Sequence, residues 1–243
     1  MIWTPVFVAV AIFLAAVLRG FTGFGFALAA VPLLSLALPP ARVVPIVVIL
    51  QAIVAFTDLR GSWRDCDWRS TRWIVAGLVA GTPVGIGLLT SLPADRVRLS
   101  IGLLIAASVA LLGAGLKLPA RPARMLALAV GVVSGVVNGL AAIPGPPIVA
   151  YFLALPQAGK VARPSIIIVF AATGLAGLAT LLLRGLVERD VLILSFTALP
   201  GMLIGSRLGV TFYRRAHPKL HRPLALAVLA VLAAMLIARA LLD

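Results

Sequence analysis

The sequence predicts an all-α polytopic membrane protein with two inverted repeats, each a broken hairpin followed by three transmembrane helices. Composition is the first observation. Of the 243 residues, 62% are hydrophobic and 12% are charged, and mean hydropathy is +1.16, whereas a soluble domain is about 25% charged. The second observation is continuity, because the apolar residues form about eight unbroken runs rather than the alternating strands of a barrel. The third is that the two halves share motifs.

The apolar runs define the membrane segments. Two of them, Trp3–Leu38 and Met125–Leu155, are too long for one crossing, and glycine and proline interrupt both near the middle. We therefore expect each of these two to form a hairpin of two shorter helices. The others are expected to be single spans: Val43–Thr57, Trp73–Thr90, Leu99–Leu116, Ser165–Leu183, Val191–Ser206 and Leu224–Ala238.

Matching motifs divide the chain into a first membrane repeat, 1–120, and a second, 121–243, within one integral membrane domain. Gly20 and Gly25 followed by Pro32 resemble Gly135 and Gly139 followed by Pro146. Two further motif pairs keep a similar separation, near half the chain length. They are Arg60–Asp65 with Arg184–Asp190, and Gly81-(x)3-Gly85 with Gly201-(x)3-Gly205.

Lysine and arginine set the expected orientation, because basic loops stay in the cytoplasm. With the Arg60–Arg72 loop inside, the cytoplasmic set has 14 members: Arg60, Arg64, Arg69, Arg72, Lys117, Arg121, Arg124, Lys160, Arg163, Arg207, Arg214, Arg215, Lys219 and Arg222. The outside set has 6: Arg42, Arg96, Arg98, Arg184, Arg189 and Arg239. This places the chain in the inner or plasma membrane with both termini outside, and it makes the two repeats inverted. Inverted repeats are typical of transporters, whose substrate sites lie near the membrane midplane.

The first hairpin tip is a candidate substrate-binding segment. It contributes Arg19, Gly20, Thr22, Gly23 and Gly25. Glycines permit irregular backbone, which survives in a bilayer only inside protein or along a watery cavity, and a helix that restarts there directs free N–H groups toward an anion. Close helix packing is the alternative role for the glycines, and Arg19 is either a counter-charge or a cytoplasmic anchor.

The second hairpin tip, Val137–Pro147, is the matching candidate. Its prolines exclude a continuous helix, and Asn138 can both donate and accept hydrogen bonds. Two polar residues in single spans, Gln51 and Thr173, join the candidate set, although a membrane threonine often bonds its own helix. From the tip itself the set takes Asn138, Gly139, Pro144, Gly145 and Pro146.

Ionisable groups are scarce within the predicted spans. All seven acidic residues lie in loops or at span ends, whereas carriers of cations usually need a carboxylate inside the membrane. The single cysteine, Cys66, makes neither a disulfide nor a metal cluster, and no cofactor or catalytic set is expected. A small anion is therefore the expected substrate. The dispersed basic loops suit anionic lipid headgroups rather than nucleic acid.

These residues resemble the TauE/SafE family of sulfite exporters. The resemblance rests on the duplicated glycine-rich element with its downstream proline, the R-G-x(2–3)-R-D turn and the G-x-x-x-G third span. It implies export or uptake of sulfite or of small organosulfur or carboxylate anions. The family's usual tip resembles G-x-G-G-G, whereas the first tip here reads Gly23-Phe24-Gly25-Phe26-Ala27.

We therefore expect a secondary transporter, not an enzyme, that exports a small anion such as sulfite or an organosulfonate by alternating access. An anion channel on the same scaffold is the alternative, and a membrane-embedded enzyme is a third, disfavoured hypothesis. We also expect that two copies of the chain can form a homodimer.

Overall fold

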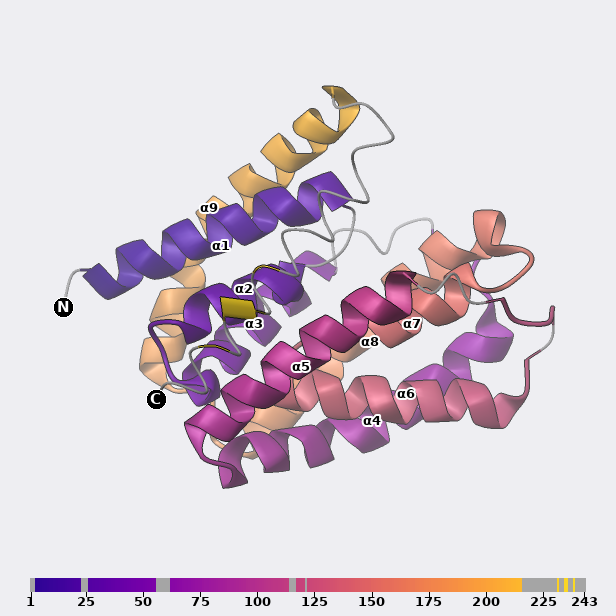
Figure 1. Cartoon of the computed structure of the whole chain (residues 1–243), viewed down its shortest axis with the longest axis horizontal. Helices are drawn as coiled ribbons and strands as arrows, with labels where there is room; N and C mark the ends of the chain where they lie inside the picture. Colours follow the sequence, from indigo (N-terminus) through magenta and orange to yellow (C-terminus); the bar gives the residue numbers. More distant parts are fainter. Residues whose placement is uncertain are drawn as a thin grey trace. The chain divides into compact units, whose positions relative to one another are not determined.

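A computed structural model describes residues 3–22, 26–55, 62–113, 117–120 and 122–215, with isolated positions near the C-terminal end. Throughout these ranges the regular elements are α-helices (Figure 1). In chain order they are α1 (Trp3–Thr22), α2 (Phe26–Ser35), α3 (Pro40–Ala55), α4 (Trp68–Ser91), α5 (Ala94–Gly113), α6 (Arg124–Ala141), α7 (Gly145–Leu153), α8 (Ala158–Leu183) and α9 (Arg189–Arg215).

The all-helical fold class is confirmed in the described ranges, and the helices there overlap the predicted apolar segments. α1 and α2 lie in the first segment predicted to be broken, α6 and α7 lie in the second, and α3, α4, α5, α8 and α9 overlap predicted single spans. The hairpin arrangement stays a prediction. Four helices are long and apolar enough to cross a membrane, namely α4, α6, α8 and the Arg189–Phe212 part of α9. The predicted last span, Leu224–Ala238, lies outside the continuously described ranges.

The chain divides into two compact units that do not coincide with its sequence halves. The first unit comprises Met1–Val47, Leu92–Val109 and Val187–Asp243, and the second comprises Val48–Ser91 and Ala110–Leu186. Each unit therefore draws helices from both predicted repeats. The repeats and their inversion stay predictions.

In the first unit, α1 lies along α9 through glycine contacts (Figure 1). A Cβ atom on Gly20 would lie 2.9 Å from the Gly209 Cα, and one on Gly205 would lie 3.1 Å from the Ala16 Cβ. Because later residues of α1 meet later residues of α9, the two helices run parallel. Glycine is needed here because any side chain would separate the two backbones.

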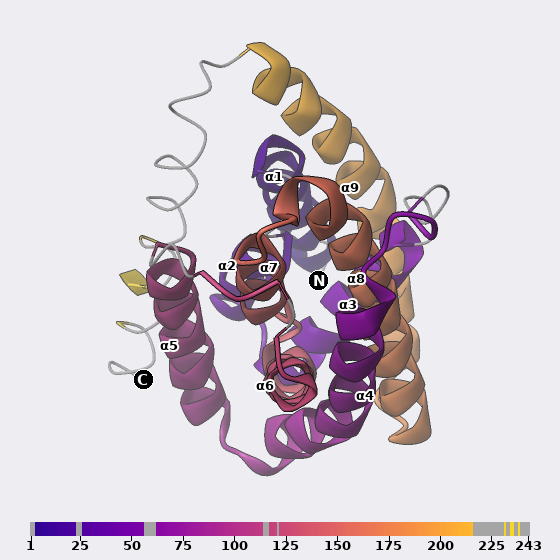
Figure 2. The ribbon, with the colours of Figure 1, turned by 90° about the vertical axis from the view of Figure 1, so that its right-hand side faces the viewer.

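The second unit contains an equivalent pair, α4 and α6, which lie side by side (Figure 2). A Cβ on Gly135 would lie 2.9 Å from the Leu78 Cα, and one on Gly85 would lie 2.9 Å from the Gly139 Cα. These glycines therefore have a packing role in the second unit. This pair is also parallel, so the basic starts of α4 and α6 lie at one end of the unit.

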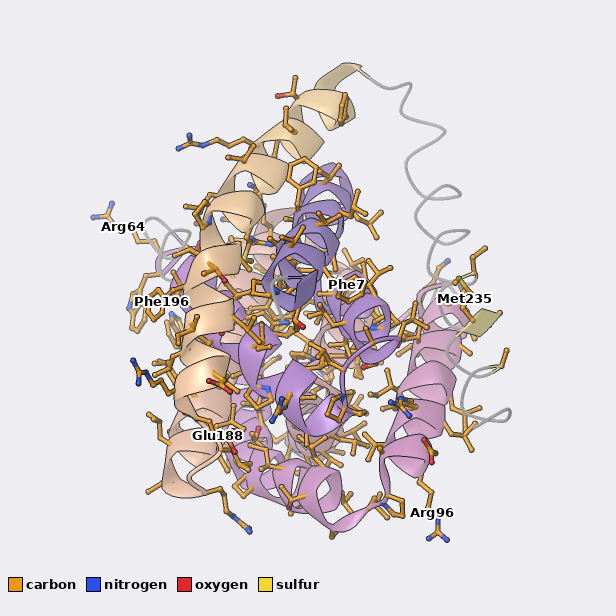
Figure 3. All side chains as sticks on the ribbon, turned by 90° about the vertical axis from the view of Figure 1, so that its left-hand side faces the viewer. Phe7, Arg64, Arg96, Glu188, Phe196 and Met235 are labelled. Atoms are coloured by element: carbon orange, nitrogen blue, oxygen red, sulfur yellow. The ribbon has the colours of Figure 1, made fainter. Side chains whose placement is uncertain are left out.

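Side-chain burial suits a membrane protein. On α1, Val8, Ile12 and Ala15 are fully buried, whereas Val10 and Leu14 on the opposite side are each 53% exposed. Phe196 of α9 is 57% exposed and projects away from the ribbon (Figure 3). Helices that are apolar on every side require lipid rather than water around them.

Candidate substrate site at the second helix break

The break between α6 and α7 is made by proline chemistry and one left-handed residue. Ala142 caps α6 with φ 54°, and its N–H donates to the Asn138 carbonyl over 2.7 Å. Pro144 has no N–H, so the Leu140 carbonyl loses its helical partner. α7 then begins at Gly145 with two more prolines. The discontinuity predicted for this tip is confirmed.

Gln51 of α3 satisfies a carbonyl at this break. Its side-chain Nε2 donates to the Ala142 carbonyl over 3.1 Å. In a continuous helix that carbonyl would accept from residue 146, but Pro146 has no N–H to give. Gln51 therefore supplies from another helix the hydrogen bond that the proline removes.

Asn138 connects the end of α6 to α8. Its Nδ2 donates to the Thr173 carbonyl over 3.2 Å, and the residue is only 1% exposed. A carbonyl only accepts, so the amide nitrogen must face Thr173 and the oxygen must face elsewhere. That oxygen, Oδ1, has no hydrogen-bond partner among the described residues.

Thr173 contributes its backbone rather than its hydroxyl. The Oγ1 atom donates to the Phe170 carbonyl of its own helix over 2.7 Å. This is the local bonding expected as the alternative for threonine in membrane helices. The carbonyl of the same residue accepts from Asn138, so the hydroxyl and the carbonyl of Thr173 serve different partners.

Two glycines let α8 approach α3 closely beside Asn138. A Cβ on Gly174 would lie 2.9 Å from the Ala52 Cα. One on Gly177 would lie 2.9 Å from Val48 Cγ1 and 3.3 Å from Asn138 Nδ2. These contacts hold α3, α6 and α8 around the break, and they bring together Gln51, Asn138 and Thr173.

The other residues predicted as site residues at this tip are Gly139, Pro144, Gly145 and Pro146. Gly139 packs against α4, where a Cβ would lie 2.5 Å from the Ile86 nitrogen. Pro144 and Pro146 are buried. Gly145 lies beside the Phe170 ring, since a Cβ on this glycine would lie 3.4 Å from the ring's Cζ atom. The second tip therefore forms a compact polar break inside an apolar unit.

At the first tip, the structure describes the approach but not the turn. Gly23 and Gly25 lie outside the described residues, as does the side chain of Thr22, the last residue of α1. Gly20 packs against α9 at Gly209. Arg19 lies in the last turn of α1 and directly precedes Gly20. The contact that Gly20 makes is near the arginine-rich end of α9.

A polar cluster near the start of α4 was not predicted from the sequence. The Tyr151 hydroxyl donates to Ser70 Oγ over 3.0 Å, and the Asp67 N–H donates to Ser165 Oγ over 2.9 Å. Cys66 is buried, with its Sγ 3.3 Å from Thr71 Oγ1. Burial is the main cause that raises the pKa of this thiol above its ordinary value. No residue spacing signals this cluster, because its members come from three separate helices and one loop.

In the described part of the break, groups suited to metal or acid–base chemistry are absent. Across the described residues, no three His, Cys, Asp or Glu side chains gather into a metal site. The polar groups at the break are amides, hydroxyls and backbone carbonyls. A broken helix with buried amides inside an apolar bundle is the arrangement that transporters use for a substrate.

The chain thus has the architecture of a membrane transporter, and comparison with known proteins agrees. Residues 8–236 match the family described as "Sulfite exporter TauE/SafE", and the chain belongs to that family. It is accordingly a multi-pass membrane transporter of small anions and not an enzyme. A relative from Cupriavidus necator, named "Probable sulfite/organosulfonate exporter TauE", is 27% identical over 217 residues, covering 86% of this chain and 84% of the relative. No solved structure matches the chain.

Proposed function

We propose that this protein exports a sulfite-type or organosulfonate anion and binds it at the break between α6 and α7. One observation carries the proposal. Asn138 is an amide buried to 1% exposure in an apolar unit, and its oxygen lacks a partner among the described residues. Such a group costs free energy unless something binds to it.

The electrostatics of the break suit an anion. The N-terminus of α7 carries a partial positive charge, and Gly145 has an N–H group there that the helix does not use. Carboxylates are absent from the described residues of the break. The first tip, with Arg19, Gly20, Thr22, Gly23 and Gly25, is proposed as a second substrate-binding segment by analogy between the repeats.

Export by alternating access completes the proposal. Inverted repeats make such a cycle available, because one part can move against the other around a fixed site. The inside-negative potential drives an anion outward with about 2.3 kcal/mol per charge per 100 mV. Export therefore needs no coupling ion, in agreement with the scarcity of acidic residues in the predicted spans.

Replacement of Asn138 tests the site directly. In liposomes loaded with sulfite or an organosulfonate, we expect Asn138→Leu to lower flux at least about tenfold, because the amide's hydrogen-bonding groups are removed. Saturable, counterflow-stimulated flux by the unaltered protein would identify a carrier rather than a channel.

Gln157→Leu is the matched control for this variant. Gln157 is an exposed amide in the same unit, and its contact to the Ala120 carbonyl is 3.5 Å long, so flux should persist. Unchanged flux in folded Asn138→Leu protein would remove Asn138 from the site. Failure of every tested anion to stabilise the unaltered protein against heat would overturn the proposed function itself.

A further inference from the structure

One hydrogen-bonding atom left over at the break is a buried acceptor. Gln51 and Asn138 each use an amide N–H on a backbone carbonyl, Ala142 and Thr173 respectively. The oxygen of Asn138 is buried and has no partner in the part of the chain that the structure describes. An amide oxygen accepts and cannot donate.

A second buried group lies on the same face of α6. Ser134 is one helical turn before Asn138, so both side chains lie along one stripe of the helix. It is fully buried, and its Oγ likewise has no partner within the described ranges. Two unsatisfied oxygens one turn apart form a polar stripe inside an apolar unit.

Backbone donors at the break are few. The four residues whose N–H groups would have no partner within the helix are 144–147, and three of them are prolines. Only Gly145 therefore has a free N–H, because the Ile148 N–H donates to the Pro144 carbonyl as the first bond of the helix. The α7 dipole still favours a negative charge. An anion that only accepts hydrogen bonds would be attracted by this field but would leave the Asn138 oxygen unpaired.

We propose that the site selects anions that also carry a hydrogen-bond donor, through a bond from the substrate's O–H or N–H to Asn138 Oδ1. This inference rests on the proposed function, because it assigns a substrate class to the same break. The favoured class comprises hydroxy- or amino-substituted sulfonates and the monoprotonated form of a small oxyanion. Selection follows from the cost of leaving a buried acceptor unpaired when the ligand lacks the donor.

The sharpest test compares two sulfonates of equal size. 2-Hydroxyethanesulfonate and propane-1-sulfonate have the same number of heavy atoms and the same charge, and they differ by a terminal hydroxyl in place of a methyl. Burial of apolar area alone favours the methyl compound. We expect the hydroxyl compound to bind at least about tenfold more tightly, measured by calorimetry on the purified full-length protein.

The Asn138→Leu variant tests whether Asn138 is the residue that distinguishes the two sulfonates. It should bind the two sulfonates with nearly equal affinity, and thermal unfolding would verify that it is folded. A preference for the hydroxyl compound that survives in folded Asn138→Leu protein would overturn the inference, because the donor would then be recognised elsewhere. The comparison within the unaltered protein stands even if the variant fails to fold.

The remaining outcomes separate the inference from the proposed function. Equal or tighter binding of propane-1-sulfonate by the unaltered protein would overturn the donor requirement. This result is expected if a bound water already donates to Asn138. It would not contradict the proposal that the protein transports an anion. Stabilisation by sodium ions without any discrimination between the sulfonates would also overturn the donor requirement. If sulfite and both sulfonates all fail to bind, the proposed function fails as well.

Discussion

At the scale of single residues, Gln51 shows how one side chain can maintain an interrupted helix. Its Nε2 reaches the Ala142 carbonyl at the α6–α7 break, where Pro146 cannot donate. Gln51 was predicted as a candidate site residue because a lone glutamine is costly in a membrane span. Its donor atom is committed to the backbone, and its role in substrate binding stays a prediction.

Removal of this amide should destabilise the folded protein. We expect Gln51→Leu to lower the free energy of unfolding by about 1–3 kcal/mol, because a buried carbonyl loses its donor. Thermal unfolding in detergent measures the effect. Gln157→Leu, at an exposed glutamine, should change stability by less than about 0.5 kcal/mol. Equal effects of the two variants would contradict the capping role of Gln51.

The single cysteine gives a prediction about alkaline pH. Burial raises the pKa of the Cys66 thiol above its ordinary value, so in the unfolded chain this thiol loses its proton at lower pH than in the folded protein. Its contribution to stability is therefore constant well below the ordinary thiol pKa of about 8.5 and decreases as pH rises through that value and beyond. Unfolding measured at increasing alkaline pH should show a steeper loss for the unaltered protein than for Cys66→Ser. Parallel curves for the two proteins would refute this expectation.

At the scale of helices, close packing depends on glycines whose surroundings differ sharply. On α4, a Cβ at Gly85 would meet the Val136 carbonyl and lie 2.9 Å from the Gly139 Cα. A Cβ at Gly87, two residues later, would meet nothing within 4 Å. The same residue type therefore has a packing function at one position and none at the other.

This contrast predicts opposite effects of alanine. Gly85→Ala should destabilise the protein by about 1–3 kcal/mol, because two backbones must move apart. Gly87→Ala should be neutral or stabilising by up to about 1 kcal/mol, because alanine favours the helix. Thermal melting curves of the two variants, recorded side by side, measure the difference. Similar stability of the two variants would mean that α4 and α6 are not in close contact.

Local chemistry explains which structural elements could be predicted. The break at Pro144–Pro147 follows from missing N–H groups, which the sequence specifies completely. Which glycine meets which helix was not predictable, because Gly20 and Gly209 are close only after the intervening chain has folded. For the same reason the sequence identified Asn138 as polar and isolated, but not its bond to Thr173.

At the scale of the whole molecule, the charge distribution predicts which loops lie in the cytoplasm. Arg64 lies in a loop expected inside, and Arg96 lies at the start of α5 in a region expected outside. Both side chains are exposed and point away from the ribbon (Figure 3). They are suitable positions for labelling from either side of the membrane.

Cysteine labelling in cells tests this orientation. In a Cys66→Ser background, a membrane-impermeant maleimide should label Arg96→Cys in intact cells. Arg64→Cys should react only after the membrane is permeabilised. These expectations follow from the bias of basic residues toward the cytoplasm. The reverse pattern would invert the proposed topology, and labelling of both positions in intact cells would contradict it entirely.

The pairing of α1 with α9 also has a consequence for biosynthesis. Gly209 is translated roughly 190 residues after Gly20, which at about 5–20 residues per second leaves α1 without its partner for roughly 10 to 40 s. During that interval the face of α1 that contacts α9 must be covered by lipid, by the insertion machinery or by a temporary helix neighbour. In a chain stalled on the ribosome before α9 is made, α1 should therefore form crosslinks with those neighbours. The same crosslinks should disappear once the complete chain has been synthesised.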